Sequence, residues 1–336
     1  MIYKDNGELE FKDFEEASLY FAKQLKAGTA IKSTNKDNKN TYKNKIVELR
    51  NVNYSMPFGK ILSDNKYHAP VPFWAISESL SEILTMPRPI QERYRPDLMD
   101  WSYNVTPERI PCYSYGERLH NYNQIMNIFN KLDNNPTSKK AFLSIYQGYD
   151  TEPSRKDVPC TLGWLLNIRD NKLDITTIMR SWDFFAGQIY DAFLANLLGT
   201  SFNSWLKNSN QKNIELGKIH FFGGSLHYYP ERNFDKLEKM LNVGETNFYD
   251  DVEPFKIDLS IDDYFKDLHR LSDAEYAFYN GNFKYADEKI KKIKEPIFRD
   301  FTRMYGIKNA KHYKKIDLIN KYKDNIEVKE FKKWLK

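Results

Sequence analysis

Cysteine is scarce in this chain: only two of the 336 residues are Cys, at positions 112 and 160. Two cysteines this far apart do not form a disulfide framework, so a reduced compartment is expected, where a thiolate is free to react. No apolar run approaches 18 residues, so no transmembrane helix is expected. The N-terminal stretch MIYKDNGELEFKDF contains no apolar signal region, which predicts a cytoplasmic location.

Several motifs that mark common chemistries are also missing. The chain has no paired CxxC, no HExxH and no Gly-rich phosphate loop. A structural zinc site and a Walker-type NTPase are therefore disfavoured, and no metal is expected. Low complexity is confined to an Asn- and Lys-rich stretch near residues 29–45, which is predicted to be a loop.

Positive charge is unevenly distributed. The net charge is +5, yet residues 284–336 hold 17 Lys and Arg against 8 Asp and Glu, which gives this segment +9 and leaves −4 for the rest. A uniformly basic nucleic-acid-binding fold is therefore disfavoured. The basic segment is predicted to form solvated helix faces, which we favour, or to dock nucleic acid.

Apolar residues are abundant enough for a large mixed domain: 41% of the chain is hydrophobic and 15% is aromatic. The chain after about residue 250 is predicted to be helical and highly charged. Further helices are expected over residues 10–27 (closed by Gly28), 72–87, 121–136 and 185–206. The last of these is mostly apolar and is expected to be central and buried on several faces. Strands are expected over residues 46–57, over 160–181 as a hairpin that turns at RDNK, and over 216–229 with a break at Gly223-Gly224.

Cys160 has two interpretations at this point. A free cysteine is usually buried and behaves as a small apolar side chain, which favours a core position. The alternative is that Cys160 is the nucleophile of an enzyme. The residues that follow it in sequence decide between the two.

Four features follow one another in order. They are Pro159-Cys160, Arg180-Ser181 with Asp183, Gly187 with Asp191, and Gly223-Gly224 with His227 and Tyr229. This pattern resembles the thymidylate synthase superfamily, in which a Pro-Cys nucleophile precedes an Arg-Ser-x-Asp motif by twenty residues. Cys160 precedes Arg180 by twenty residues, and Asp191 lies eleven beyond Arg180. Upstream segments of the family are also matched, by NPTSKKAFLSIY, YSYGERL and AISESLSEIL. The resemblance therefore covers about residues 10–235.

The resemblance implies the thymidylate synthase fold, an α/β (α+β) architecture with a large bent mixed sheet covered by helices. Two such sheets would pack back to back in a homodimer with shared active sites. The catalytic domain is expected over residues 1–250, followed by a charged, mostly helical C-terminal extension over 251–336. The implied substrates are a nucleoside monophosphate and 5,10-methylenetetrahydrofolate, with no metal and no membrane.

The resemblance makes Cys160 the nucleophile that adds to C6 of a pyrimidine. Arg180 would favour the thiolate and hold the nucleotide phosphate, unless it forms an interior salt bridge. Ser181 would bind the same phosphate.

Lysines stand where the family completes its phosphate site with arginines. The other subunit lends two arginines, and here those positions are Lys139 and Lys140, which keep the charge and lose the bidentate geometry. Lys43 is a candidate, by position only, for the remaining arginine, and it is equally well a solvated lysine.

Further site residues are implied by position. Glu78 stands where the family has its acid/base glutamate, with Glu82 one turn later as the rival, and it would organise water and protons around the ring. Tyr115 matches the tyrosine that helps to remove the C5 proton. His227 and Tyr229 match the pair that binds the sugar, although Tyr229 could instead pack at an interface.

Positions near the folate are matched by Asp183, Gly187 and Trp101. Trp101 could equally well be a core residue.

Asp191 is the most informative departure from the methylating enzymes. Those enzymes carry Asn there, and an amide offers one donor and one acceptor, which suits O4 and N3–H of uracil. Cytosine presents the opposite pattern, an N4 donor and an N3 acceptor, which a carboxyl meets if it shares a proton with N3. A buried carboxyl holds such a proton near neutral pH. Asp here resembles the deoxycytidylate hydroxymethylases of phages and related cytidylate hydroxymethylases; the alternative is an Asp that caps the long helix.

Two other differences favour a hydroxymethyl product. Thr161 stands where thymidylate synthases have His, and about 80 charged residues replace the short apolar C-terminus that closes over the family's site. Both suggest a site that admits water. The implied enzyme is a hydroxymethyltransferase: Cys160 adds to C6 of dCMP (favoured) or CMP, C5 takes up the one-carbon unit of the folate, and water adds to the exocyclic methylene.

Two rival functions stay open. The same fold could act on dUMP by methylation or hydroxymethylation, although Asp191 argues against it. A nucleotide- or nucleic-acid-binding protein on this scaffold would use the basic tail to dock nucleic acid or other nucleotide-metabolism proteins. The expected location is the cytoplasm, that of a host cell if the chain is phage-encoded.

Overall fold

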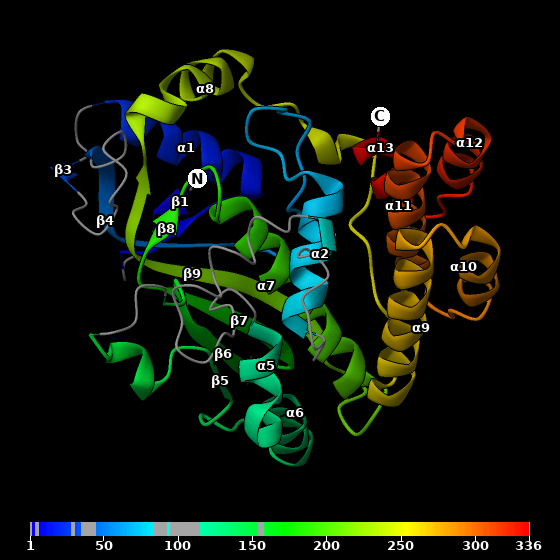
Figure 1. Ribbon diagram of the computed structural model, residues 1–336. Helices are drawn as coiled ribbons and strands as arrows, with labels where there is room; N and C mark the ends of the chain where they lie inside the picture. The colour runs from blue at the N-terminus through cyan, green and yellow to red at the C-terminus, as the bar shows by residue number, and fades with distance from the viewer. Residues whose placement is uncertain are drawn as a thin grey trace.

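The computed structural model describes residues 2–3, 7–27, 31–34, 45–83, 93–94, 115–153 and 158–335 (Figure 1). Lys43, Trp101 and Cys112 lie outside the described residues. The strands are β1 (Ile2–Tyr3), β2 (Leu9–Glu10), β3 (Ile31–Thr34), β4 (Lys45–Pro57), β5 (Phe142–Ser144), β6 (Thr161–Arg169), β7 (Lys172–Met179), β8 (Trp182–Asp183) and β9 (Glu215–Tyr228). The described strands form one mixed sheet in the order β1-β2-β4-β9-β7-β6-β5, with β3 beside β4 and β8 beside β9.

The predicted hairpin is confirmed as β6 and β7. Its turn residues Asp170 and Asn171 both have positive φ, 49° and 59°, as a tight two-residue hairpin turn requires. The antiparallel register brings the two open ends of the hairpin together, and the Arg180 amide donates to the Cys160 carbonyl at 2.9 Å. The twenty-residue spacing between Cys160 and Arg180 is therefore the length of one hairpin.

The predicted break at Gly223-Gly224 is wrong, because β9 continues through both glycines. A Cβ on Gly223 would lie 3.2 Å from the Trp182 ring, and one on Gly224 would lie 3.0 Å from the Arg180 carbonyl oxygen. The glycines admit neighbouring groups to the surface of the strand, and the strand itself continues through them.

Helices cover one face of the sheet. The described helices before residue 250 are α1 (Phe14–Lys26), α2 (Pro72–Ile83), α5 (Tyr115–His120), α6 (Gln124–Asn134), α7 (Gln188–Lys207) and α8 (Pro230–Val243). Helix α7 packs against β7, β9 and α2, and nearly all of its residues are buried, as its apolar sequence predicted (Figure 1). The α2–α7 contact positions residues of both helices beside the open end of the hairpin.

The chain after residue 250 is helical, as predicted. It forms α9 (Ile261–Tyr279), α10 (Phe283–Ile290), α11 (Pro296–His312), α12 (Ile316–Asp324) and α13 (Lys329–Trp334), an outer layer beside α2 (Figure 1). Phe193 of α7 packs against Phe255, Phe301 and Trp334, with ring centroids 5.6–6.4 Å apart. The C-terminal helices therefore share the hydrophobic core of the sheet domain.

Cations of the basic tail are matched by acidic side chains. Glu327 accepts from Arg299 and Arg303, and Lys321 donates to Asp287 at 2.5 Å. This pairing favours the interpretation as solvated helix faces over that of a free basic surface. Among the described residues, the helices lack the length and apolar character that crossing a membrane would require.

Candidate active site

Cys160 and Arg180 lie together at the open end of the β6–β7 hairpin. The Cys160 side chain is exposed, which rules out the core interpretation. A terminal nitrogen of Arg180 lies 4.0 Å from Sγ, and the guanidinium also donates at 2.8 Å to the carbonyls of Val158 and Pro159. No ion pair of Arg180 is found among the described residues, so the expected alternative of an interior salt bridge is not observed. Its cation is held beside the thiol, where it favours the thiolate.

Tyr115 reaches the same place from α5. It is buried, its hydroxyl lies 3.5 Å from the Thr161 amide nitrogen, and its ring packs against Trp164. The hydroxyl therefore lies next to the Cys160–Thr161 peptide. The Thr161 side chain points away from this point: it is fully buried and its hydroxyl donates to the sulfur of Met179. Thr161 consequently does not supply the polar surface for water that its sequence position suggested.

Asp191 lies in the first turn of α7, but it is not the helix cap. The helix begins at Gln188 with Gly187 as its N-cap, so the capping alternative is wrong. Oδ2 of Asp191 instead accepts the indole N–H of Trp182 at 2.8 Å. Burial raises the pKa of Asp191 to about 7, against the lowering effect of this hydrogen bond. The carboxyl therefore carries a proton in part of the population at neutral pH.

Glu78 approaches Asp191 from α2. Burial, reinforced by the negative charge of Asp191, raises the pKa of Glu78 to about 8. Two carboxyls whose pKa values lie near neutrality can accept and release protons in the pH range where most enzymes work. The side chain of the rival residue, Glu82, lies outside what the structure describes.

His227 and Asp183 are neighbours on paired strands. His227 of β9 aligns with Asp183 of β8, and the His227 ring meets Tyr229 edge-on at 5.5 Å. His227 is buried and its Nδ1 has no partner in the part of the chain that the structure describes. Burial lowers the pKa of His227, against the opposing effect of Asp183, so the ring is neutral and offers Nδ1 for hydrogen bonding.

Asp183 and Gly187 lie at the turn that connects β8 to α7. Oδ1 of Asp183 accepts the amides of Phe185 and Ala186, at 2.8 and 2.9 Å, while Oδ2 has no partner among the residues described. Ser181, which follows Arg180, is half-buried between β7 and β8.

Lys139 and Lys140 are not brought to this site within one chain. Both are exposed on the loop before β5, and the Ala141 carbonyl accepts the Leu166 amide on β6. Cys160 precedes the start of β6, so the lysines lie about 20 Å from it along the strand.

Asp191 is surrounded by aromatic side chains that the sequence motifs did not identify. Trp182 occupies the unspecified position of the Arg-Ser-x-Asp motif, and its ring stacks on Phe221 and Tyr54 at 5.4 and 6.2 Å. Tyr54 in turn accepts a hydrogen bond from the Gln188 amide at 3.2 Å. The sequence predicted the strands β4 and β9, but not the stacking of their rings against Trp182.

A buried carboxylate also lies beside His227. Glu48 of β4 pairs in register with His227 and accepts from the Ser225 hydroxyl at 2.6 Å and from Arg50 at 3.0 Å. Burial by itself would raise the pKa of Glu48, but the Ser225 and Arg50 hydrogen bonds outweigh it and hold the pKa below its usual range.

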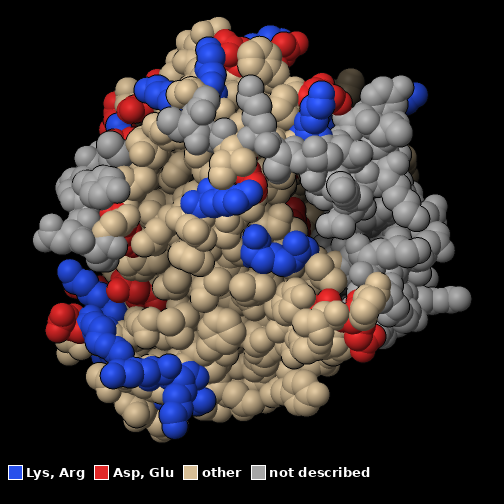
Figure 2. All heavy atoms as spheres, turned by 90° about the vertical axis from the view of Figure 1, so that its left-hand side faces the viewer, with Lys and Arg blue, Asp and Glu red and all other residues tan. Residues whose placement is uncertain are grey.

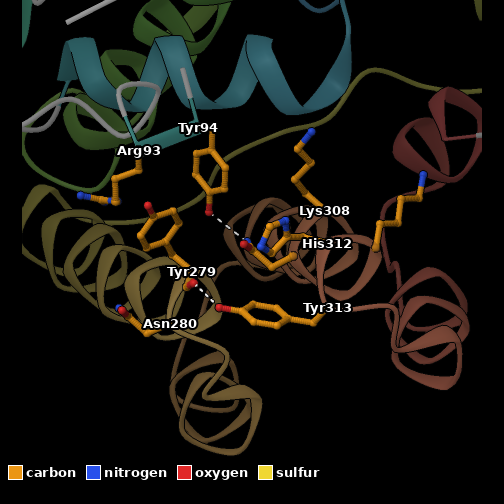
Figure 3. A pocket seen from close by; sticks show the side chains of 9 residues that line it. Arg93, Tyr94, Tyr279, Asn280, Lys308, His312 and Tyr313 are labelled. Carbon is orange, nitrogen blue, oxygen red and sulfur yellow. Dashed lines mark hydrogen bonds between the residues drawn. The ribbon is translucent and has the colours of Figure 1, made fainter. Parts of the chain in front are cut away.

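A hollow of about 780 Å³ lies between α9, α11 and residues 93–94 (Figure 3). The Arg93 guanidinium pairs with Glu275, and the Tyr94 hydroxyl donates to the same carboxylate at 2.8 Å. Arg93 and Lys308 point away from one another in Figure 3. Because its cations diverge and its best-placed polar groups already hold the fold together, this hollow is not a second candidate site.

The surface near the ends of β4 and β9 is mostly uncharged. Figure 2 shows that face, with a few Lys and Arg side chains standing separately in a neutral area and others gathered at its lower edge. Separate cations on this face suit small anions better than the continuous phosphate track of a nucleic acid. Groups of His, Cys, Asp and Glu able to hold a metal are absent from the described residues.

Comparisons with known proteins point in one direction. The sequence profile of the family described as thymidylate synthase matches residues 74–333. A protein of Methanosarcina mazei named "Putative thymidylate synthase" is 34% identical over 135 residues, 38% of this chain and 58% of that protein. The deoxyuridylate hydroxymethyltransferase of Delftia phage PhiW-14 is 25% identical over 262 residues, 69% of this chain and 67% of that protein. The chain thus spans 58% of the length of the archaeal relative.

The fold agrees with these matches. The thermostable thymidylate synthase A from Bacillus subtilis superposes with a TM-score of 0.54 at 16% identity, covering 73% of this chain and 86% of that one. The expected architecture, a mixed sheet covered by helices, is confirmed by this likeness. The profile match also extends beyond residue 250 and includes the C-terminal helices.

Proposed function

The chain belongs to the thymidylate synthase family, and we propose that it is a hydroxymethyltransferase that acts on a cytidine monophosphate with 5,10-methylenetetrahydrofolate as co-substrate. The observation that carries the choice of base is the buried Asp191 carboxyl, whose pKa of about 7 allows it to hold a proton at neutral pH.

Cys160 supplies the nucleophile in this proposal. Its exposed thiol, next to the Arg180 cation, forms a thiolate that adds to C6 of the pyrimidine and makes C5 nucleophilic. The second terminal nitrogen of Arg180 has no partner within the described part of the chain, so it can bind the nucleotide phosphate together with Ser181. The neutral His227 and Tyr229 hydrogen-bond the sugar.

Asp191 and Glu78 handle the protons. The Asp191 carboxyl donates its proton to N3 of cytosine and accepts from the N4 amino group, which activates the ring toward the thiolate. Glu78, with its pKa of about 8, and the Tyr115 hydroxyl guide the loss of the C5 proton. Because Asp191 acts in its protonated form, turnover is expected to fall as the pH rises through about 7.

The turn between β8 and α7 fits a folate. Oδ2 of Asp183 is open to accept an N–H from a pterin ring, and Gly187 lies in the same turn. Methylenetetrahydrofolate supplies the one-carbon unit when it is bound. C5 would bond to that unit, and loss of the C5 proton and of tetrahydrofolate would leave an exocyclic methylene. Water would add to this methylene as the Cys160 thiolate leaves, which would give the 5-hydroxymethyl nucleotide.

A second candidate is the same reaction on dUMP. It is favoured by the likeness to the phage PhiW-14 protein, whose name states that it acts on deoxyuridylate.

Product analysis is the direct test. The protein is incubated with dCMP, CMP or dUMP, each with methylenetetrahydrofolate, and the masses of the products are measured by mass spectrometry. We expect a hydroxymethyl group on a cytosine nucleotide. A hydroxymethyl group on dUMP alone would establish the second candidate. A methyl group on any nucleotide would contradict the addition of water. If no nucleotide gave a product, the protein would be better explained as a nucleotide- or nucleic-acid-binding protein.

A homodimer with shared sites is part of the proposal. Phe142 of β5 and Phe222 of β9 are 38% and 42% exposed, and their neighbours in the sheet include Leu165 and Ile178. Alternate residues of β7, such as Ile175, are buried on the side of α7, so this apolar strip lies on the sheet face away from the helix. Packing two such faces would carry Lys139 and Lys140 toward the partner's site.

Subunit complementation tests this sharing. The Lys139→Ala/Lys140→Ala variant and the Cys160→Ser variant, each of low activity, are co-expressed with different tags and the mixed dimer is isolated. One site of that dimer contains both an intact Cys160 and intact lysines, so we expect activity well above that of either parent. Lys212→Ala, an exposed lysine in the loop after α7, serves as control. Mixed dimers no more active than their parents would show that the lysines do not act across the interface.

A further inference from the structure

Trp182 is one of the most deeply buried side chains near the candidate site, at 1% exposure, and its only polar atom is committed to Asp191. We propose that Trp182 determines which base is accepted: its indole N–H holds Oδ2 of Asp191 as a hydrogen-bond acceptor, so the carboxyl proton stays on Oδ1 and the donor–acceptor order matches cytosine. The inference rests on the proposed function, in which Asp191 contacts the base.

The indole ring cannot easily move. It stacks on the rings of Phe221 and Tyr54, which also stack on each other at 4.8 Å. It also lies against two glycines, where a Cβ on Gly223 would stand 3.2 Å from the six-membered ring and one on Gly187 would stand 3.4 Å from Cδ1. The same Cβ on Gly187 would lie 3.2 Å from Oδ2 of Asp191. The indole therefore occupies one lone pair of Oδ2, while Oδ1 has no partner among the described residues.

The chemistry of the indole sets the position of the proton. An indole N–H only donates, so it favours the state in which Oδ2 is a carbonyl or carboxylate oxygen, and it disfavours the state in which Oδ2 carries the proton. With the proton on Oδ1, the carboxyl offers a donor at Oδ1 and a further lone pair at Oδ2. Cytosine, with acceptor N3 beside donor N4, complements this order, whereas uracil, with donor N3 beside acceptor O4, needs the reverse. Without the indole, the carboxyl could present either order.

The surroundings of Asp191 explain why this hydrogen bond has a measurable pH signature. The titratable groups that face Asp191 in the described structure are Glu78 from α2 and Tyr54 from β4, and burial raises the pKa of both. The Trp182 hydrogen bond lowers the pKa of Asp191 and opposes the effect of burial. Its removal should therefore raise the pKa of Asp191 and shift the alkaline loss of activity to higher pH.

The test compares the unaltered chain with Trp182→Phe, Asp191→Asn and the double variant. Binding of dCMP and dUMP is measured by calorimetry, together with the pH profile of turnover. Trp205→Phe is the matched control, since Trp205 is equally buried and its indole N–H has no partner in the described structure. In Trp182→Phe we expect the preference for dCMP over dUMP to fall about tenfold, the effect of one hydrogen bond to a carboxyl. We also expect the alkaline loss of turnover to occur at higher pH.

The Asp191→Asn variant provides a sharper version of the test. With Trp182 present, the indole should hold the oxygen of the new amide, so the NH₂ group faces N3 and dCMP still binds better than dUMP. In the double variant the amide can turn over, and the preference should reverse to dUMP.

Each outcome is decisive. Trp182→Phe could weaken the binding of dCMP and dUMP equally, or leave the ratio of their affinities the same as in Trp205→Phe. In either case the role of Trp182 is packing alone, and the inference is overturned while the proposed function stands. If the unaltered protein itself prefers dUMP, or binds neither nucleotide, the choice of cytosine falls, and the inference falls with it.

Discussion

Replacing Cys160 by serine should lower turnover by at least about 10³-fold, the scale on which loss of a covalent nucleophile acts. A serine hydroxyl is not ionised at neutral pH, and the Arg180 cation 4.0 Å from Sγ can stabilise a thiolate but not generate an alkoxide. Because residue 160 is exposed, the fold should be unaffected and the melting temperature should change little. Steady-state kinetics and thermal unfolding of the same preparation measure both effects.

Cys112→Ser is the matched control, as Cys112 is the only other cysteine in the chain. That variant should keep its activity. A 5-fluorinated cytosine nucleotide, which lacks the C5 proton that the reaction must lose, should leave a covalent adduct on the native chain and none on Cys160→Ser. Adduct formation on both proteins, or substantial turnover by Cys160→Ser, would remove Cys160 from the mechanism.

Asp191→Asn should lower turnover of the cytosine nucleotide about 100-fold and move kcat/KM toward uracil, a change of the size that loss of a general acid produces. An amide can donate a hydrogen bond to N3, but it cannot pass a proton to the ring, so cytosine is no longer activated toward the thiolate. Uracil does not need that proton. Competition between dCMP and dUMP in one reaction mixture measures the ratio directly.

The Asp191→Ala variant distinguishes a general loss of activity from a change in base preference. It removes both oxygens, so both nucleotides should react poorly, and the freed indole N–H of Trp182 should cost some stability. An unchanged ratio of kcat/KM for dCMP to that for dUMP in Asp191→Asn would contradict the assignment of Asp191 to base recognition. Equal losses on dCMP and dUMP in that variant would point to a structural role for Asp191.

Local sequence patterns predicted most of the elements that hold the site. The RDNK turn and its flanking apolar runs predicted the β6–β7 hairpin, and the apolar composition of residues 185–206 predicted the buried α7. The hairpin is a local structure, so its register follows from its turn, and Cys160 and Arg180 meet for that reason alone. Gly223-Gly224 was misjudged because a glycine pair that admits a neighbouring side chain resembles, in sequence, one that ends a strand.

The tail shows a second limit of local reasoning. Its lysines and arginines stand out in sequence, whereas their acidic partners come from other helices and loops, as in the pairs of Lys289 with Asp273 and of Lys321 with Asp287. Charge counting along the chain cannot assign such pairs, because they form between residues distant in sequence.

The sequence by itself determined the order and spacing of the nucleophile, the arginine and the carboxyl, and with them the family and the chemistry expected. Only the tertiary structure decided how Asp191 is held. Trp182, Tyr54 and Phe221 come from three strands, and Glu78 comes from a helix packed across α7, so no window of sequence contains the group. Burial by these neighbours, an effect of packing, moves the Asp191 pKa to about 7 and allows one carboxyl to share a proton with a base.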